Sequence, residues 1–222
     1  MNRVNYQKKL DEMIEQFKEQ NLIPHILIHS CCAPCSSYVL EYMTQYFRIT
    51  DFYYNPNIEP KKEYDKRVKE LEKLLNKMEL KNPVDFVVGD YDNEAYKEAV
   101  KFFEGEPEGG KRCSLCFHMR LSEAAKKARE LGIKYCTTTL TISPLKNVEL
   151  INRIGKSVSQ KYGVTWIPSE FRRKGGFQRS IELSRKYDLY RQNYCGCIFS
   201  KFEIDEKRRM KEEALLNGEI IT

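Results

Sequence analysis

Seven of the eight cysteines in this 222-residue chain lie in three short motifs. The first is the run His29-Ser30-Cys31-Cys32-Ala33-Pro34-Cys35-Ser36, the second is the C-x-x-C pair Cys113/Cys116, and the third is the C-x-C pair Cys195/Cys197. Packing does not require thiols to lie so close together, whereas metal ligation and thiol redox chemistry do. Cys136 stands alone among apolar and β-branched residues, and we interpret it as structural.

The number of clustered thiols bears on the kind of metal. A zinc site takes at most four protein ligands, so one zinc ion would leave three of the seven thiols unused. The surplus favours an iron-sulfur cluster, or a cluster beside a second metal, although the spacing matches neither ferredoxin pattern. A thiol-disulfide oxidoreductase is the other interpretation of a C-x-x-C pair, but two such pairs and a C-x-C make it less economical.

Acidic and imidazole groups near these motifs are further candidates for metal ligands, proton donors or residues that support the site. Asp90, Tyr91 and Asp92 follow a predicted strand, where a carboxylate could ligate iron or donate a proton, although aspartate is equally typical of a turn. His29 and His118 adjoin cysteine motifs, and a histidine in such a place commonly hydrogen-bonds around a site rather than ligating.

A basic and aromatic segment runs from residue 171 to residue 194. Basic side chains neutralise phosphates and aromatic rings stack on unpaired bases, so the segment predicts an RNA-binding surface. Its aromatic residues include Phe171, Phe177 and Tyr194, and its candidate RNA-binding residues are Arg172, Arg173, Lys174, Arg179 and Arg191. A solvated basic loop is the alternative, and the formal net charge of +6 permits a nucleic-acid partner without requiring one.

The apolar run before the first cysteine motif predicts a short buried strand, and the residues after it predict a helix. The thiols then lie on a strand-to-helix turn, where free backbone N–H groups and the helix dipole favour anions such as thiolates. Similar patterns predict strands at 26–28, 49–54, 84–88, 135–140 and 164–167, and helices at 5–20, 37–47, 63–80, 94–103, 113–131, 147–162, 181–187 and 200–216.

Strands that alternate with helices predict an α/β fold, with a doubly wound, mainly parallel five-stranded sheet covered by helices on both faces. Ligands bind such sheets at the carboxyl ends of the strands, so we expect the first two cysteine motifs to meet there and the third to join them. Neither G-x-G-x-x-G nor the P-loop sequence is present, which disfavours a nucleotide at the first turn.

The chain is long enough for one domain over residues 1–222. Within it we expect a lead-in helix at 1–22, an α/β core at 23–168, and a segment at 169–222 whose basic loop, C-x-C motif and final helix complete the site. No stretch is apolar for long enough to cross a bilayer, and residues 1–6 lack a secretory pattern, so the sequence predicts a cytoplasmic protein without a membrane partner.

Several motifs together resemble the QueH family, the cobalamin-independent epoxyqueuosine reductases. They are the first cysteine run, Asn55-Pro56-Asn57-Ile58, Gly110 to Cys116, Arg120-Leu121, Thr138-Thr139-Leu140 through Ser143-Pro144, and Tyr190-Arg191-Gln192 through Cys195-Gly196-Cys197, and they span residues 25 to 200 in order. The resemblance implies a Rossmann-like sheet similar to that of the adenine-nucleotide alpha-hydrolases. It also implies reduction of the epoxide of epoxyqueuosine, on the modified anticodon base of a tRNA, to the alkene of queuosine.

The resemblance further implies a 4Fe-4S cluster and an additional metal ion, iron or zinc, with the seven clustered thiols as ligands. The substrate would be the anticodon loop of a tRNA, and an external donor such as a ferredoxin or flavodoxin would supply electrons. The epoxide oxygen must be protonated as it leaves, for which Asp92, and then Asp90 and Tyr91, are the candidates. A non-catalytic zinc-binding RNA-binding protein is the alternative from another class.

Overall fold

The computed structural model describes residues 4–216 and contains one sheet of five parallel strands, in the order β3-β2-β1-β4-β5. The strands are β1 (His25–Ser30), β2 (Arg48–Tyr53), β3 (Val84–Val88), β4 (Tyr135–Thr138) and β5 (Thr165–Trp166). This confirms the predicted α/β class and the parallel five-stranded sheet.

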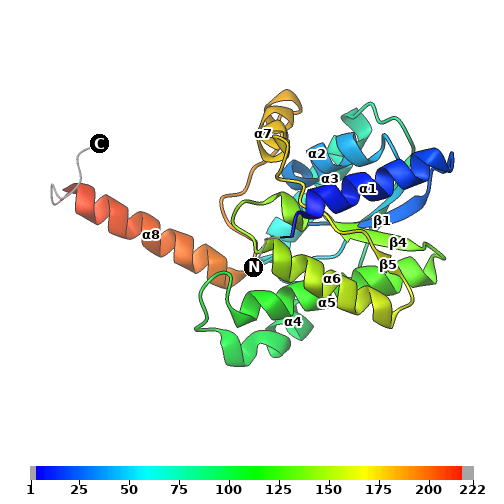
Figure 1. Cartoon of the computed structure of the whole chain (residues 1–222). Helices are drawn as coiled ribbons and strands as arrows, with labels where there is room; N and C mark the ends of the chain where they lie inside the picture. The colour runs from blue at the N-terminus through cyan, green and yellow to red at the C-terminus, as the bar shows by residue number, and fades with distance from the viewer. Residues whose placement is uncertain (1–3, 217–222) are drawn as a thin grey trace.

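Helices cover both faces of the sheet (Figure 1). They are α1 (Tyr6–Glu19), α2 (Ala33–Met43), α3 (Lys61–Lys77), α4 (Asn93–Val100), α5 (Lys111–Glu130), α6 (Val148–Lys161), α7 (Gly176–Lys186) and α8 (Ile198–Leu216), with short 3-10 helices η1 (Lys101–Phe103) and η2 (Thr139–Ile142). None of the helices in the described part of the chain is both long and apolar enough to span a membrane.

Successive side chains of a strand point to opposite faces of the sheet, and the central strand β1 shows which helices pack on each face. Ile26 and Ile28 face α1 and α2, which contribute Leu10 and Val39 to a shared core. Leu27 faces the opposite side, where it packs with residues of α5 and α6. Each face therefore buries one parity of the central strand, as expected of a doubly wound parallel sheet.

The bounds of several elements differ from the sequence prediction. The helix predicted at 37–47 is α2, which spans Ala33–Met43, and two further differences have a visible local cause. β4 ends at Thr138, because the Thr138 side chain accepts a hydrogen bond from Leu140 N and turns the chain into η2. α7 begins at Gly176 rather than near residue 181, because Gly175 adopts a left-handed φ of 76° that reverses the chain into the helix. Part of the predicted basic loop is consequently helical.

The strand order reverses at β1. The chain places β2 and β3 on one side of β1 and then crosses to place β4 and β5 on the other side. The carboxyl ends of β1 and β4 therefore flank a topological switch point, which is where open α/β sheets bind ligands. Cys31 follows β1 and Thr139 follows β4, and the Thr139 hydroxyl donates to Cys31 Sγ at 3.6 Å.

Candidate metal centre

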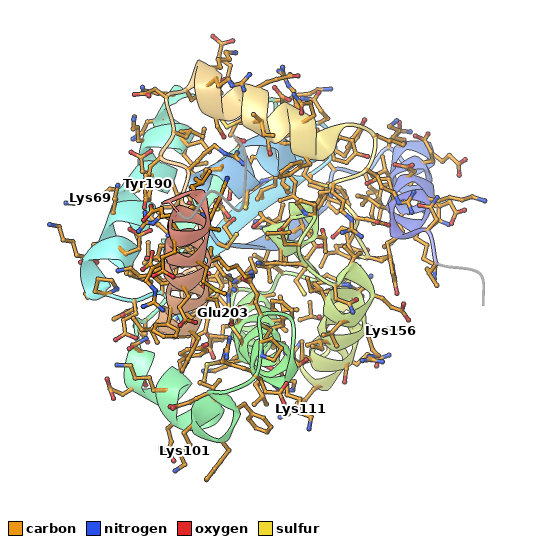
Figure 2. The ribbon with its side chains drawn as sticks, turned by 90° about the vertical axis from the view of Figure 1, so that its left-hand side faces the viewer. Lys69, Lys101, Lys111, Lys156, Tyr190 and Glu203 are labelled. Atoms are coloured by element: carbon orange, nitrogen blue, oxygen red, sulfur yellow. The ribbon has the colours of Figure 1, made fainter. Side chains whose placement is uncertain are left out.

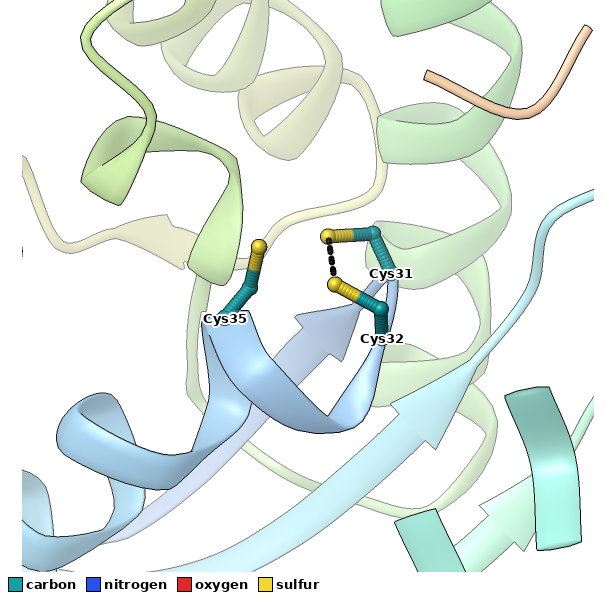
Figure 3. A group of neighbouring side chains, drawn as sticks. All are labelled: Cys31, Cys32 and Cys35. Carbon is teal, nitrogen blue, oxygen red and sulfur yellow. Dashed lines mark hydrogen bonds between the residues drawn. The ribbon is translucent and has the colours of Figure 1, made fainter. Parts of the chain in front are cut away.

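The first cysteine motif forms a compact thiol group at this switch point (Figure 3). The sulfurs of Cys31, Cys32 and Cys35 all lie within 4.8 Å of one another, and Cys31 Sγ lies 3.7 Å from Cys32 Sγ. Hydrogen bonds from the Cys32 and Cys35 thiols hold the pKa of Cys31 well below its usual range. The donated proton is harder to remove from Cys32, whose pKa is raised to about 12. The group thus supports a thiolate at Cys31.

Each cysteine motif lies at the N-terminus of a helix. Cys32 is the N-cap of α2, Cys113 and Cys116 lie in the first turns of α5, and Cys197 directly precedes α8. Backbone N–H groups reach two of these sulfurs: Gly109 N donates to Cys113 Sγ at 3.2 Å, and Ser200 N donates to Cys197 Sγ at 3.4 Å. Three helix dipoles therefore favour negative charge on the thiols. Burial opposes this effect, because it raises the pKa of Cys113 and raises that of Cys116 to about 12.

The three motifs meet along two adjoining cavities. The larger cavity, of about 230 Å³, is lined by Cys31, Cys35 and Cys195 among others. The smaller, of about 20 Å³, is lined by the four thiols of the second and third motifs. Cys195 borders both cavities, so the C-x-C motif lies beside the other two cysteine motifs.

A buried arginine and a half-buried lysine lie beside the thiols. Arg120 is 2% exposed, donates to Asn55 Oδ1 and approaches Cys116 Sγ at 4.0 Å. Lys146 Nζ donates to Cys195 Sγ at 3.4 Å. Within residues 4–216, neither cation has a carboxylate at ion-pair distance, so both would offset negative charge that the neighbouring sulfurs carry when they ligate a metal.

His29 fixes the carboxyl ends of three neighbouring strands instead of ligating. Its Nε2 lies 3.0 Å from the carbonyl of Tyr54 and must donate to it, so Nδ1 accepts from the Thr138 hydroxyl at 2.8 Å. Burial lowers the pKa of His29 to about 3, which keeps the ring neutral. This agrees with the supporting role expected from its position. His118 is exposed on α5.

The C-x-C motif is held in place by α3 and the loop before it. Arg67 on α3 donates to the carbonyl of Cys195 at 3.1 Å, and Glu59 N donates to the carbonyl of Gly196 at 2.9 Å. Glu63 accepts from the hydroxyl of Tyr190, which is labelled beside α8 in Figure 2. The segment that carries Cys195 and Cys197 is thereby anchored against the body of the fold.

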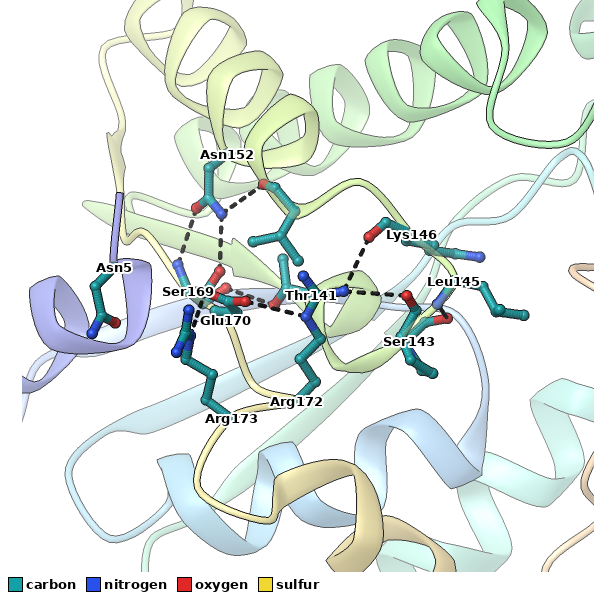
Figure 4. A network of polar contacts seen from close by, with 12 residues as sticks. Asn5, Thr141, Ser143, Leu145, Lys146, Asn152, Ser169, Glu170, Arg172 and Arg173 are labelled. Atoms are coloured by element: carbon teal, nitrogen blue, oxygen red, sulfur yellow. Dashed lines mark hydrogen bonds and ion pairs between the residues drawn. The ribbon is translucent and has the colours of Figure 1, made fainter. Parts of the chain in front are cut away.

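A polar network supports the loop that carries Lys146 (Figure 4). Asn152 on α6 accepts from Ser169 N at 3.0 Å and donates to the carbonyl of Ser169 at 2.9 Å. The Ser169 hydroxyl contacts the Thr141 hydroxyl at 3.0 Å. Arg172 donates to the carbonyls of Pro144 and Lys146 at 3.2 and 3.5 Å, and this holds the backbone of the cavity-lining loop.

The acidic candidates lie elsewhere. Asp92 is the exposed N-cap of α4 and accepts from Ala95 N at 2.9 Å, and Asp90 is also exposed. The Tyr91 hydroxyl donates to the carbonyl of Ile58 at 2.8 Å. Tyr91 and Asp92 border a separate hollow and do not line either thiol cavity. Their catalytic role stays a prediction, beside capping and turn roles that the geometry shows.

Most of the predicted RNA-binding side chains already have acidic partners. Arg172 and Arg173 pair with Glu170, Lys174 with Asp11, and Arg179 with Glu41. Arg191 alone among the five lines the larger cavity. Phe171 was expected to offer its ring to a base, and this is wrong, because the side chain is 1% exposed and packs in the core beside α2.

Several residues of the site were not singled out by sequence reasoning. Arg67 and Lys146 carry no motif that separates them from other basic residues of a charged chain. Arg120 belongs to the Arg120-Leu121 motif described above, but only the fold shows that its guanidinium is buried beside Cys116. The one sequence signal for Lys146 is its position just beyond the fourth predicted strand and Ser143-Pro144. Ligands bind at the carboxyl edge of a parallel sheet, and this position places Lys146 near that edge.

Comparison with known proteins places this arrangement in a family. A family model described as "Epoxyqueuosine reductase QueH" matches residues 26–203. A relative of that name from Streptococcus pyogenes serotype M1 is 42% identical over 200 residues, which covers 89% of this chain and 78% of the relative. Relatives from Staphylococcus epidermidis and Thermotoga maritima, also of that name, are 42% and 40% identical over 216 and 188 residues. They cover 95% and 82% of this chain, and 91% and 93% of the relatives.

Proposed function

This chain belongs to the epoxyqueuosine reductase QueH family, and we propose that it reduces the epoxide of epoxyqueuosine in tRNA to the alkene of queuosine. The observation that carries the proposal is the convergence of three cysteine motifs on two adjoining cavities at the switch point of the sheet. A non-catalytic zinc protein has no evident use for the larger, open cavity beside Cys31 and Cys195.

We propose that the seven clustered thiols hold a 4Fe-4S cluster and an adjacent iron or zinc ion. The residues present fit such groups, because the donors are soft sulfurs, all eight cysteines are free, and Arg120 and Lys146 offset negative charge near the thiols. When bound, these groups would relay electrons singly and offer a Lewis-acid position for the epoxide oxygen.

The balance of the reaction requires two electrons and two protons. The two carbon–oxygen bonds of the epoxide break, a carbon–carbon double bond forms, and the oxygen leaves as water. We propose an external donor such as a ferredoxin or flavodoxin as the electron source. Because the substrate is a tRNA, we propose that the reaction takes place in the cytoplasm.

The protein's own groups would bind and orient the substrate. We propose that the anticodon loop lies over the larger cavity, with the modified base inserted toward Cys31 and Cys195. Phe177 and Tyr194 line this cavity and offer aromatic rings to the base. Arg191 lies at the same cavity, where it is placed to meet a phosphate, and the basic residues Arg172, Arg173, Lys174 and Arg179 would extend the contact with RNA.

The test combines metal analysis with turnover. Protein prepared without oxygen should contain about four irons or more per chain, show broad visible absorbance, and convert epoxide-containing tRNA when a chemical reductant is supplied. Cys31→Ser should lose iron and turnover, whereas the matched control Cys136→Ser, in the core away from both cavities, should keep both. Stoichiometric zinc without iron, together with no turnover, would refute the proposal in favour of a zinc-binding RNA protein.

A further inference from the structure

The larger cavity contains polar side-chain atoms that have no partner in the protein. Gln192 lines it, and its Oε1 atom is buried without a hydrogen bond to any described residue. Arg67 Nη2 and Arg120 Nε, from two other lining residues, are also buried and unpartnered. Buried polar groups of folded proteins are normally satisfied, so an acceptor and two donors left open at one cavity indicate that a ligand completes them.

We propose that Gln192 is a specificity-determining residue that accepts a hydrogen bond from the N1–H group of a guanine-type substrate base. The inference rests on the proposed function, because it takes the modified base, a 7-deazaguanine, to be the group that enters the cavity. Only an N–H or O–H group can satisfy the open oxygen. At ring position 1 a guanine-type base presents an N–H donor, whereas an adenine-type base presents an acceptor. Both bases carry an exocyclic amino group, so the oxygen of Gln192 discriminates between them only by facing N1.

The position of Gln192 is fixed by its chain neighbours. Two residues earlier, Tyr190 N donates to Glu70 Oε2 at 2.9 Å. Two residues later, the Tyr194 hydroxyl donates to the carbonyl of Glu59 at 3.3 Å. The backbone of this segment is therefore held from both sides before a ligand arrives, which is the preorganisation that a reader of base edges needs.

The rest of the cavity has complementary chemistry. Lys146 and Arg191 are donors, so they suit phosphate oxygens or the O6 atom of a guanine-type base but cannot accept from its N1–H group. Phe177 and Tyr194 line the same cavity and can stack on a base of any kind. Recognition of N1–H is thus assigned to the unpartnered amide oxygen of Gln192.

The experiment measures binding rather than reduction. RNA stem–loops with the sequence of a substrate anticodon arm, carrying either 7-deazaguanine or 7-deazaadenine at the modified position, are titrated against the metal-loaded protein by fluorescence anisotropy. The wild type should bind the 7-deazaguanine stem–loop about 10- to 100-fold more tightly, the range expected when one buried acceptor is either satisfied or left open. Gln192→Met, which preserves length and removes the amide, should lose most of that preference.

Two further variants keep the test decisive. Gln178→Met makes the same change at an exposed position of α7 outside the cavity, and should retain the wild-type preference. Gln192→Glu keeps acceptor oxygens, so it should also retain the preference. Gln192→Ala removes the amide by truncation and replaces Gln192→Met if that variant does not fold. Equal binding by the wild type, or an undiminished preference in the variant that lacks the amide, would overturn the inference.

These outcomes are separable from those of the proposed function. A wild type that reduces the epoxide but does not distinguish the two stem–loops would remove the role of Gln192 and leave the enzyme activity intact. A wild type that distinguishes them but never reduces the epoxide would refute the proposed reaction while the assignment of Gln192 as a base reader stands.

Discussion

Asp51 is a buried carboxyl group in the centre of β2, close to the first cysteine motif. Ser30 donates to Asp51 Oδ1, Ser36 donates to the Ser30 hydroxyl at 3.0 Å, and Asp51 Oδ2 has no partner. Burial raises the pKa of Asp51 to about 7, although the hydrogen bond from Ser30 works in the opposite direction. A carboxyl group in this state prefers to keep its proton.

This pKa predicts how stability depends on pH. Between about pH 4, where an exposed Asp titrates, and about pH 7, the folded protein holds a proton at Asp51 that the unfolded chain has released. The free energy of unfolding therefore falls as pH rises through this window. Asp51→Asn removes that loss, so the variant should gain up to about 4 kcal/mol relative to the wild type between pH 4 and pH 7.

Urea unfolding of both proteins at several pH values checks this expectation. His29 has the opposite effect, because its lowered pKa makes stability rise with pH, but it is present in both proteins and cancels in the difference. Asp85→Asn, at an exposed position of β3, controls for removing a carboxylate from the sheet. Parallel pH profiles for Asp51→Asn and the wild type would contradict the assignment.

Residue-scale chemistry was predictable from the sequence where a residue type is rare and clustered. Cysteine is seldom grouped without a chemical reason, so the seven thiols could be singled out before the fold was known. Asp51 and Arg120 could not be, because aspartate and arginine are common in this chain and only burial separates them from surface residues. The same ambiguity affected Asp92, whose side chain caps a helix.

At the scale of elements, helix N-termini organise the thiol assembly. α2, α5 and α8 begin at the three cysteine motifs, so the positive ends of three helices converge on one region. The strands were predictable from apolar runs, and β3 has the predicted bounds. The starts of α7 and η2 were not, because they depend on a left-handed Gly175 and a side-chain bond of Thr138 that only local backbone geometry reveals.

Gly196, between the two cysteines of the C-x-C motif, is expected to tolerate no side chain. Its φ is +132°, and a Cβ atom would lie 2.8 Å from Ile58 Cγ1 and 3.1 Å from Arg67 Nη1. Gly196→Ala should therefore lower the free energy of unfolding by about 1–3 kcal/mol and displace Cys195 and Cys197, with loss of bound metal. Chemical denaturation and metal analysis measure the two effects.

Gly105→Ala provides the matched control for that substitution. A Cβ atom at Gly105 would meet nothing within 4 Å, so the change should alter stability by less than about 0.5 kcal/mol. If Gly196→Ala were as stable and as rich in metal as Gly105→Ala, the close packing of the C-x-C turn against α3 would not matter for the site.

At the scale of the whole molecule, many basic side chains are already paired with acidic ones and only some remain free to bind RNA. The formal net charge is +6, yet many basic side chains are engaged in ion pairs, among them four of the five predicted RNA contacts. α8, which extends away from the body of the molecule in Figure 1, also pairs its own charges, as in Arg208 with Asp205. Net charge alone therefore could not locate the RNA surface, whereas the fold places Arg191, one of the five predicted RNA-binding residues, at the larger cavity.

Arg191 should consequently contribute more to tRNA binding than an average surface arginine. It lines the larger cavity, and the preceding residue, Tyr190, is held by the hydrogen bond from its backbone N to Glu70 Oε2. The Arg191 guanidinium donates to the Ser184 hydroxyl at 3.0 Å, and within residues 4–216 it has no ion pair with a carboxylate. Arg191→Gln should weaken tRNA binding roughly three- to tenfold at low salt and reduce the slope of log affinity against log salt by about one.

Arg208→Gln, which removes an arginine paired with Asp205 on α8, should leave that slope nearly unchanged. Filter-binding titrations across a range of salt concentrations measure both quantities, and equal slopes for Arg191→Gln and Arg208→Gln would show that tRNA does not contact the cavity through Arg191.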